Sequence, residues 1–100
     1  MNASEVLNKA ADLIEVYGWV QGHAGGLGTG FCAAGAIAWA AGAIAWTATA
    51  KTVEEHDSLI LSAHVRLRQA IDGRDGIAWN DAPGRTKKEV IQKLREAANG

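Results

Sequence analysis

Cys32 is the residue in this chain whose type and position are best suited to chemistry. It follows a glycine-rich segment and stands at the expected start of a helix, in residues 31–50, which read FCAAGAIAWAAGAIAWTATA. The positive end of a helix dipole and the unpaired N–H groups there favour a thiolate and can stabilise an oxyanion. A nucleophilic cysteine also needs a base and an orienting group. The residues available for these roles are His23 or His64 as the base, together with Asn80 and Asp81. The competing interpretation makes Cys32 a small core residue, because free cysteines are among the most buried residues.

A second candidate is a shallow binding site between the glycine-rich segment and a turn near residue 80. If these two parts of the chain fold against each other, they bring together Trp19, Gln21, Trp79, Asn80 and Asp81. The competing interpretation is local. Asn and Asp beside a Pro-Gly turn commonly bond to their own backbone, and the tryptophan then covers the end of the helix bundle.

No cofactor and no metal ion are predicted. The glycines of Gly26-x-Gly28-x-Gly30 precede a helix, but no βαβ unit comes before them and no Gly-Lys-Ser/Thr follows, so they do not indicate a nucleotide site. His56 and His64 fall on one helix face about 12 Å apart along its axis. That separation is too large for two ligands of one ion.

The elements that must position these residues are helices. Spacing of apolar residues predicts helices over residues 3–17, 31–49, 52–71 and 86–98, in a single domain of residues 1–100. Asn2, Thr29, Thr52 and Thr86 are the predicted N-caps, while Gly18 and Gly73 are predicted to end helices. A short β-hairpin, in which residues 19–22 pair with residues 30–32, is the one predicted strand pair. The expected fold class is therefore all-α, with four helices around the apolar helix 31–49.

The apolar helix contains a seven-residue repeat. Gly-Ala-Ile-Ala-Trp occurs at residues 35–39 and again at residues 42–46. One stripe of the helix is then Cys32, Gly35, Trp39, Gly42 and Trp46. A helix that is apolar all round is buried in a domain or in a membrane. The run just reaches the length of a membrane span, but Ala and Gly dominate it and no basic cluster flanks it, so burial in the domain is predicted. The alternation of Gly and Trp also allows a dimer seam.

Composition excludes several classes of protein. A chain of 100 residues with a formal net charge of −1 has no electrostatic footprint for nucleic acid. One cysteine excludes an internal disulfide and a cysteine-based zinc cluster. The first residues, MNASEVLNKAADL, lack the basic region and apolar run of a signal peptide. A cytoplasmic protein is therefore expected.

Three motifs in order resemble an uncharacterised family of small actinobacterial and bacteriophage proteins. They are Gly-Trp-x-Gln-Gly at 18–22, Cys-Ala-x-Gly-Ala at 32–36, and Trp-Asn-Asp at 79–81 followed by Thr-x-x-Glu-Val at 86–90. The second copy of Gly-Ala-Ile-Ala-Trp departs from the family pattern. The resemblance implies an origin in an actinobacterium or its phage, and a grouping of Cys32 with the Trp79–Asp81 turn. It implies no reaction.

The function expected from the sequence is binding rather than catalysis. We expect a cytoplasmic interaction protein that associates with itself or with another protein, with a phage-encoded modulator of a host protein as the specific form. A small-molecule ligand is not identified by the sequence. The alternatives are a cysteine-dependent hydrolase or transferase with Cys32 as nucleophile, and a small membrane-active protein.

Overall fold

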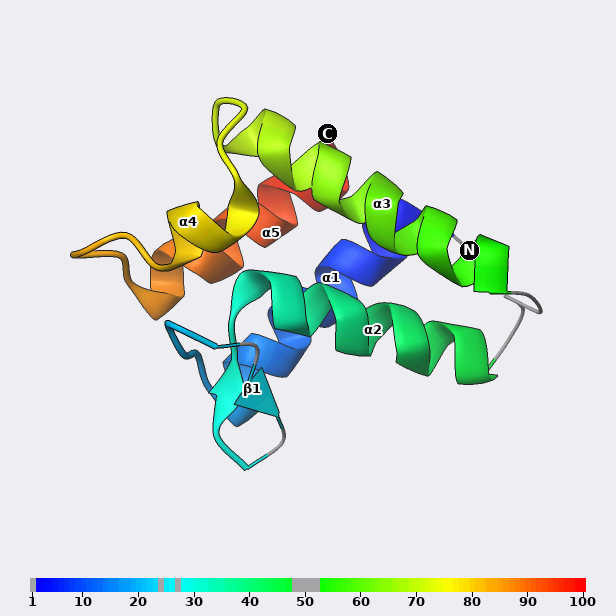
Figure 1. Ribbon diagram of the computed structural model, residues 1–100, viewed down its shortest axis with the longest axis horizontal. Coiled ribbons are helices and arrows are strands. Elements are labelled where there is room, and N and C mark those ends of the chain that lie inside the picture. The colour runs from blue at the N-terminus through cyan, green and yellow to red at the C-terminus, as the bar shows by residue number, and fades with distance from the viewer. Residues whose placement is uncertain (1, 24, 27, 48–52) are drawn as a thin grey trace.

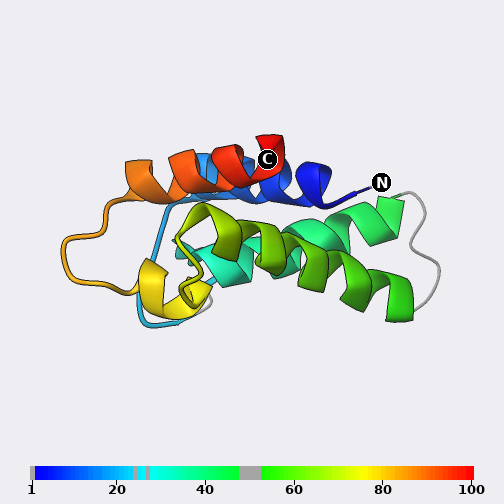
Figure 2. The same ribbon diagram turned by 90° about the horizontal axis from the view of Figure 1, so that it is seen from above.

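The chain folds into two layers of helices (Figures 1 and 2). The structure is a computed structural model that describes residues 2–23, 25–26, 28–47 and 53–100, with the backbone alone at 43–47 and 53–56. Its helices are α1 (Ala3–Tyr17), α2 (Ala33–Thr47), α3 (Val53–Ala70), α4 (Gly76–Asn80) and α5 (Lys87–Asn99), and its strands are β1 (Gly25–Gly26) and β2 (Gly30–Phe31). Helices α1 and α5 form one layer, and α2 and α3 form the other. The predicted mainly helical fold with one hairpin is confirmed.

Helix α1 lies at the centre of the packing, because it contacts α2, α3 and α5. Its start and end follow the sequence signals. The Asn2 side chain accepts a hydrogen bond from the Glu5 N–H at 3.0 Å, and Gly18 ends the helix with a φ of 107°. The buried face carries Val6, Leu7 and Ile14 among other apolar residues, as the helical spacing predicts.

Helices α3 and α5 also use the predicted caps where the structure describes them. Thr86 and Glu89 form the reciprocal capping box that opens α5. Helix α3 ends before Gly73, whose N–H donates to the Arg68 carbonyl at 2.7 Å. Thr52, the predicted cap of α3, lies outside the described residues. The short helix α4 was not predicted, because five residues are too few to show a helical period.

The glycine-rich segment forms the predicted hairpin with a different outer strand. Gly25 pairs with Phe31 and Gly26 with Gly30 in antiparallel register, whereas residues 19–22 were expected there. Trp19 instead forms a parallel bridge on Phe31, and the Val20 N–H donates to the Phe31 carbonyl at 3.1 Å. The fully buried Phe31 is thus held by its backbone from both sides.

Two of the hairpin glycines are required by close backbone contacts. Gly30 has a φ of 91°, and a Cβ there would lie 2.5 Å from the Gly18 carbonyl carbon. Gly25 has a φ of 84°, and a Cβ there would overlap the Gly30 carbonyl oxygen. Only glycine fits such positions. The glycine content that reads as a flexible connector in the sequence therefore builds a tight turn.

Helix α2 is buried on one side only over residues 33–42, the part whose side chains the structure describes. Ala33, Ala36, Ile37, Ala40 and Ala41 are buried against the rest of the molecule. Ala38 is exposed, and Trp39 is 47% exposed. The sequence predicted burial all round, because an entirely apolar helix does not show which of its sides faces water. Within the described ranges, no helix is long and apolar enough to cross a membrane.

Candidate functional site

Asn80 joins three parts of the chain that are distant in sequence. Its Oδ1 accepts hydrogen bonds from the Trp19 Nε1–H at 2.7 Å and from the Ala33 N–H at 2.9 Å. Its Nδ2 donates to the Val20 carbonyl at 3.0 Å and to Asp81 Oδ1 at 2.9 Å. The side chain is fully buried, and its amide has two donors and two acceptor lone pairs. All of its bonding capacity is therefore used in holding the structure together.

Gln21 and Asp81 add further hydrogen bonds between the same two segments, closer to the protein surface. Gln21 Nε2 donates to the carbonyls of Asn80 and Ala82 at 3.0 and 3.1 Å, and the Gly22 N–H donates to Asp81 Oδ1 at 3.0 Å. The hydrogen bond from Gly22, followed by the one from Asn80, lowers the pKa of Asp81 below its ordinary value of 3.8. These residues therefore fasten the start of the glycine-rich segment to the end of α4. We call the set Trp19, Gln21, Asn80 and Asp81 the loop–turn joint.

Trp79 lies apart from the loop–turn joint. Its side chain is 6% exposed and belongs to the hydrophobic core. The Arg85 guanidinium stacks over its ring at 4.2 Å, and Arg85 Nε donates to the Trp79 carbonyl at 3.0 Å. Of the five residues expected to line one shallow site, the structure thus brings four together by direct hydrogen bonds, and Trp79 packs beneath Arg85.

Cys32 is the N-cap of α2. The Ala36 N–H donates to the Cys32 carbonyl at 2.9 Å, and the Gly35 N–H donates to Cys32 Sγ at 3.2 Å. Thr29, the predicted cap, lies three residues too early to do this. Cys32 as a whole is 6% exposed, and two N–H groups of the helix start are already occupied, Ala33 by Asn80 and Gly35 by the Cys32 sulfur. The geometry matches that of a buried capping residue.

The two candidate bases are in different places. His23 is exposed on the glycine-rich segment, close enough to Asp81 to help lower the pKa of that carboxyl. His64 is half-buried on α3. Burial lowers the pKa of His64, and the nearby Asp75 carboxylate opposes this shift. In the described part of the chain, the one side-chain hydrogen bond of Cys32 is with Gly35, so neither histidine is bonded to the thiol.

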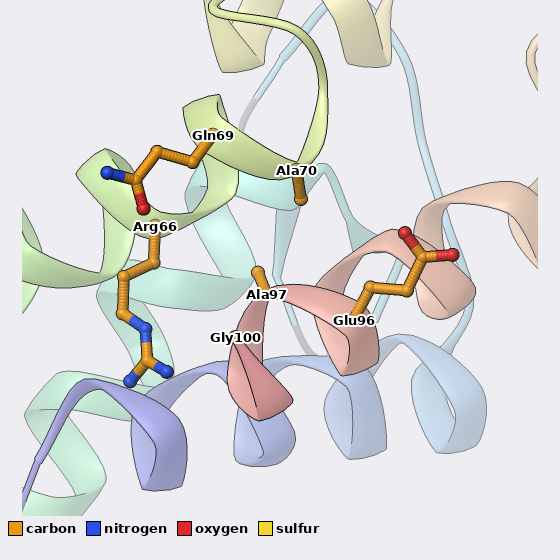
Figure 3. A pocket seen from close by; sticks show the side chains of 6 residues that line it. All are labelled: Arg66, Gln69, Ala70, Glu96, Ala97 and Gly100. Atoms are coloured by element: carbon orange, nitrogen blue, oxygen red, sulfur yellow. The ribbon is translucent and has the colours of Figure 1, made fainter.

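The described residues build no metal centre, and the depression between α3 and α5 is not shaped to hold a ligand. No group of three or more His, Cys, Asp or Glu side chains in these ranges could hold a metal ion. An open depression of about 240 Å³ lies between α3 and α5, which is smaller than most ligand pockets. In Figure 3, Gln69 and Glu96 extend to opposite sides of it, and Arg66 points towards α1, where it bonds Ser4 Oγ at 2.7 Å. The polar groups of this depression therefore do not converge on a ligand.

An exposed aromatic surface is formed by side chains from the end of α1 and from α2. Tyr17 and Trp39, each 47% exposed, contact the buried ring of Phe31 edge to face, with centroid distances of 6.2 and 5.6 Å. Ala38 is exposed beside Trp39. We call Tyr17, Ala38 and Trp39 the aromatic surface. Phe31 therefore supports both aromatic rings of this surface from the protein interior.

The sequence indicated this surface only indirectly. Tyr17 is the last residue of the helix predicted over residues 3–17, and Trp39 was predicted to be buried with the rest of α2. The available signal was the repeated Gly-Trp stripe, which also allowed a dimer seam. In the structure that stripe is buried at Cys32 and Gly35, exposed at Trp39 and half-exposed at Gly42, while the Trp46 side chain lies outside the described residues.

Comparison with known proteins identifies a family but no activity. The chain belongs to a family described as Family of unknown function (DUF6197), whose model matches residues 1–100. No curated protein and no solved structure matches the chain.

Proposed function

We propose that this protein is a non-catalytic binding protein and that the aromatic surface is where its partner docks. The observation that carries the proposal is the half-exposed Trp39 on an entirely uncharged helix, which contacts the same Phe31 ring as the half-exposed Tyr17 does. Tryptophan and tyrosine dominate the energetics of protein interfaces, because they bring a large contact area at a small cost in conformational entropy. The partner is a protein surface that is itself apolar and uncharged at the contact.

The polar candidates support binding over catalysis. Asn80 uses all four of its hydrogen bonds inside the fold, so it has none to offer a substrate. Cys32 is covered and caps α2. A catalytic cysteine needs access and a base within hydrogen-bond reach. The loop–turn joint is therefore a structural device that fixes the hairpin against α4, and the hairpin in turn presents Phe31 beneath the aromatic surface.

We propose that the protein acts in the cytoplasm. The single cysteine is free, which suits a reducing compartment. The resemblance to actinobacterial and bacteriophage proteins adds the specific form of the proposal, a modulator that acts by binding a protein of the host cell.

Photo-crosslinking tests the proposed surface. A benzophenone amino acid placed at Trp39 should form covalent adducts with a protein when cells that express the chain are irradiated. Leu61 is a matched control, because it is an apolar residue of α3 that is 66% exposed and lies outside the aromatic surface. Adducts at position 39 but not at 61 are expected. Adducts at neither position, or equal labelling at both, would remove the basis for the proposal.

A further inference from the structure

We infer that the aromatic surface and the exposed side of α2 are covered by a second copy of this chain, with the two α2 helices antiparallel across a two-fold axis. The inference rests on the proposed function and names its partner. In this pair, the half-exposed Trp39 of each copy packs against Gly42 of the other copy.

The charge of the face restricts the partner. Helix α2 contains no charged residue between Ala33 and Thr47. A charged group from another protein that was buried against it would have no counter-ion and would lose its hydration. The partner must therefore offer an uncharged apolar face, and the same face of a second copy meets that requirement. The formal net charge of −1 adds little long-range repulsion between two copies.

The exposed side of α2 carries a large side chain, Trp39, and close to it a position without a side chain, Gly42. Trp39 is 47% exposed, and Gly42, one turn further along α2, is half-exposed. A Cβ at Gly42 would meet nothing within 4 Å, so no contact with the described residues requires glycine there. Glycine within a helix costs about 1 kcal/mol relative to alanine. Close approach of another molecule is the physical use of a bare backbone at this position.

Two-fold symmetry can bring the Trp39 side chain of one copy to the bare backbone at Gly42 of the other. In an antiparallel pair whose axis is level with residues 40–41, Trp39 of each copy lies opposite Gly42 of the other. A two-fold interface uses the same patch on both copies, so the patch must be complementary to itself. The three-residue offset between Trp39 and Gly42, about 4.5 Å along the helix, satisfies this condition.

The size of the face makes the association weak. An aromatic side chain buries 150–250 Å² when fully covered, so two that are half-exposed offer roughly 100 Å² each. Ala38, Gly42 and their neighbours add to this, but the interface stays in the class below about 1,200 Å² in which complexes are transient. A dissociation constant of about 100 µM is therefore expected rather than a permanent dimer.

Sedimentation velocity from about 10 µM to about 1 mM, a range that brackets this affinity, tests the inference with three variants. The wild-type chain should shift from monomer to dimer over this range. Trp39→Lys should remain monomeric throughout. Gly42→Ala should bind about tenfold more weakly, because its methyl group occupies the space where Trp39 of the other copy packs, while its midpoint of unfolding in urea rises. Leu61→Lys, which alters an exposed apolar residue on α3, should associate as the wild type does.

Gly42→Ala keeps the test decisive even if Trp39→Lys folds poorly, because the alanine variant is expected to be the more stable monomer. A wild-type chain that stays monomeric at all concentrations overturns the inference. So does an unchanged affinity in both Trp39→Lys and Gly42→Ala. The photo-crosslinking experiment at position 39 distinguishes a failure of the second-copy inference from a failure of the proposed function. An adduct with a different protein retains the binding function and rejects the second copy, whereas no adduct rejects both.

Discussion

At the scale of single residues, Asn80 is a fully buried polar side chain whose four hydrogen bonds connect distant parts of the fold. Replacing it with alanine leaves the Trp19 indole N–H, the Ala33 N–H and the Val20 carbonyl without their partner. A buried polar group that loses its partner costs about 1–3 kcal/mol. We expect Asn80→Ala to lower the free energy of unfolding by about 3 kcal/mol or more, measured by urea denaturation.

Asn99→Ala is the matched control for this prediction. Asn99 is the exposed last residue of α5, and its replacement should change stability by less than about 0.5 kcal/mol. If Asn80→Ala cost no more than this control, the hydrogen bonds described for Asn80 would not be contributing to the fold.

Cys32 is expected to be protected in the folded protein. The residue is 6% exposed and its sulfur accepts the Gly35 N–H, so we expect a reagent to reach the thiol only when the chain opens. Alkylation by iodoacetamide in native buffer should be slower than in denaturant by at least about a hundredfold. A native rate equal to or above the denatured rate would instead support the cysteine-dependent enzyme, and substrate screening would then be justified.

At the scale of elements, the glycine-rich hairpin is fixed by its backbone contacts. Gly30→Ala places a methyl group against the Gly18 carbonyl at a φ of 91°. We expect a loss of about 3 kcal/mol in the free energy of unfolding, because an alanine there is both strained and overpacked. Urea denaturation measures the change.

Gly28→Ala is the comparison for the hairpin. A Cβ at Gly28 meets nothing within 4 Å, and the residue does not adopt a left-handed conformation. Its stability should stay within about 0.5 kcal/mol of the wild type. Similar effects of the two substitutions would mean that the hairpin does not form the tight turn described here.

The elements differ in how well the sequence could predict them. Helices α1 and α5 were predicted closely, because local signals define both: Asn2 and Gly18 bound α1, and Thr86 caps α5. The outer strand of the hairpin and the cap of α2 were missed. Their choice depends on contacts between Gly18, Gly30 and Phe31 that span the glycine-rich segment, and such contacts leave no periodic pattern in the sequence.

The sequence could only say which residues would form the candidate site if two distant segments came into contact. These segments are the glycine-rich segment and the turn near residue 80, and the hydrogen bonds of Trp19, Gln21 and Asp81 show the contact. About sixty residues separate the two sides, so no local rule could establish it. The exposure of Trp39 was likewise hidden, since every face of α2 is apolar.

At the scale of the whole molecule, acid is expected to weaken the fold through His64. Burial lowers the pKa of His64 from its ordinary 6.5, and Asp75 only partly offsets this. The unfolded chain therefore binds this proton at a higher pH than the folded chain does, so the free energy of unfolding falls as the pH drops below 6.5 through the lowered pKa. Urea denaturation between about pH 8 and pH 5, the range over which a histidine titrates, measures the slope.

His64→Gln should flatten this part of the pH profile. Glutamine keeps a polar side chain of similar size but does not titrate, so the variant should lose less stability than the wild type on going below pH 6.5. Parallel profiles for the two proteins would show that His64 takes up its proton equally well in the folded and unfolded states.

The most direct test of the interaction surface is the indole N–H region of the ¹H–¹⁵N spectrum, recorded as the protein concentration rises. The chain has four tryptophans, and Trp39→Phe assigns the signal of Trp39, which is 47% exposed. If the aromatic surface pairs with a second copy, the Trp39 signal should move with concentration while that of Trp19, bonded to Asn80, stays in place. A Trp39 signal that does not move up to about 1 mM, roughly ten times the expected dissociation constant, would contradict the account.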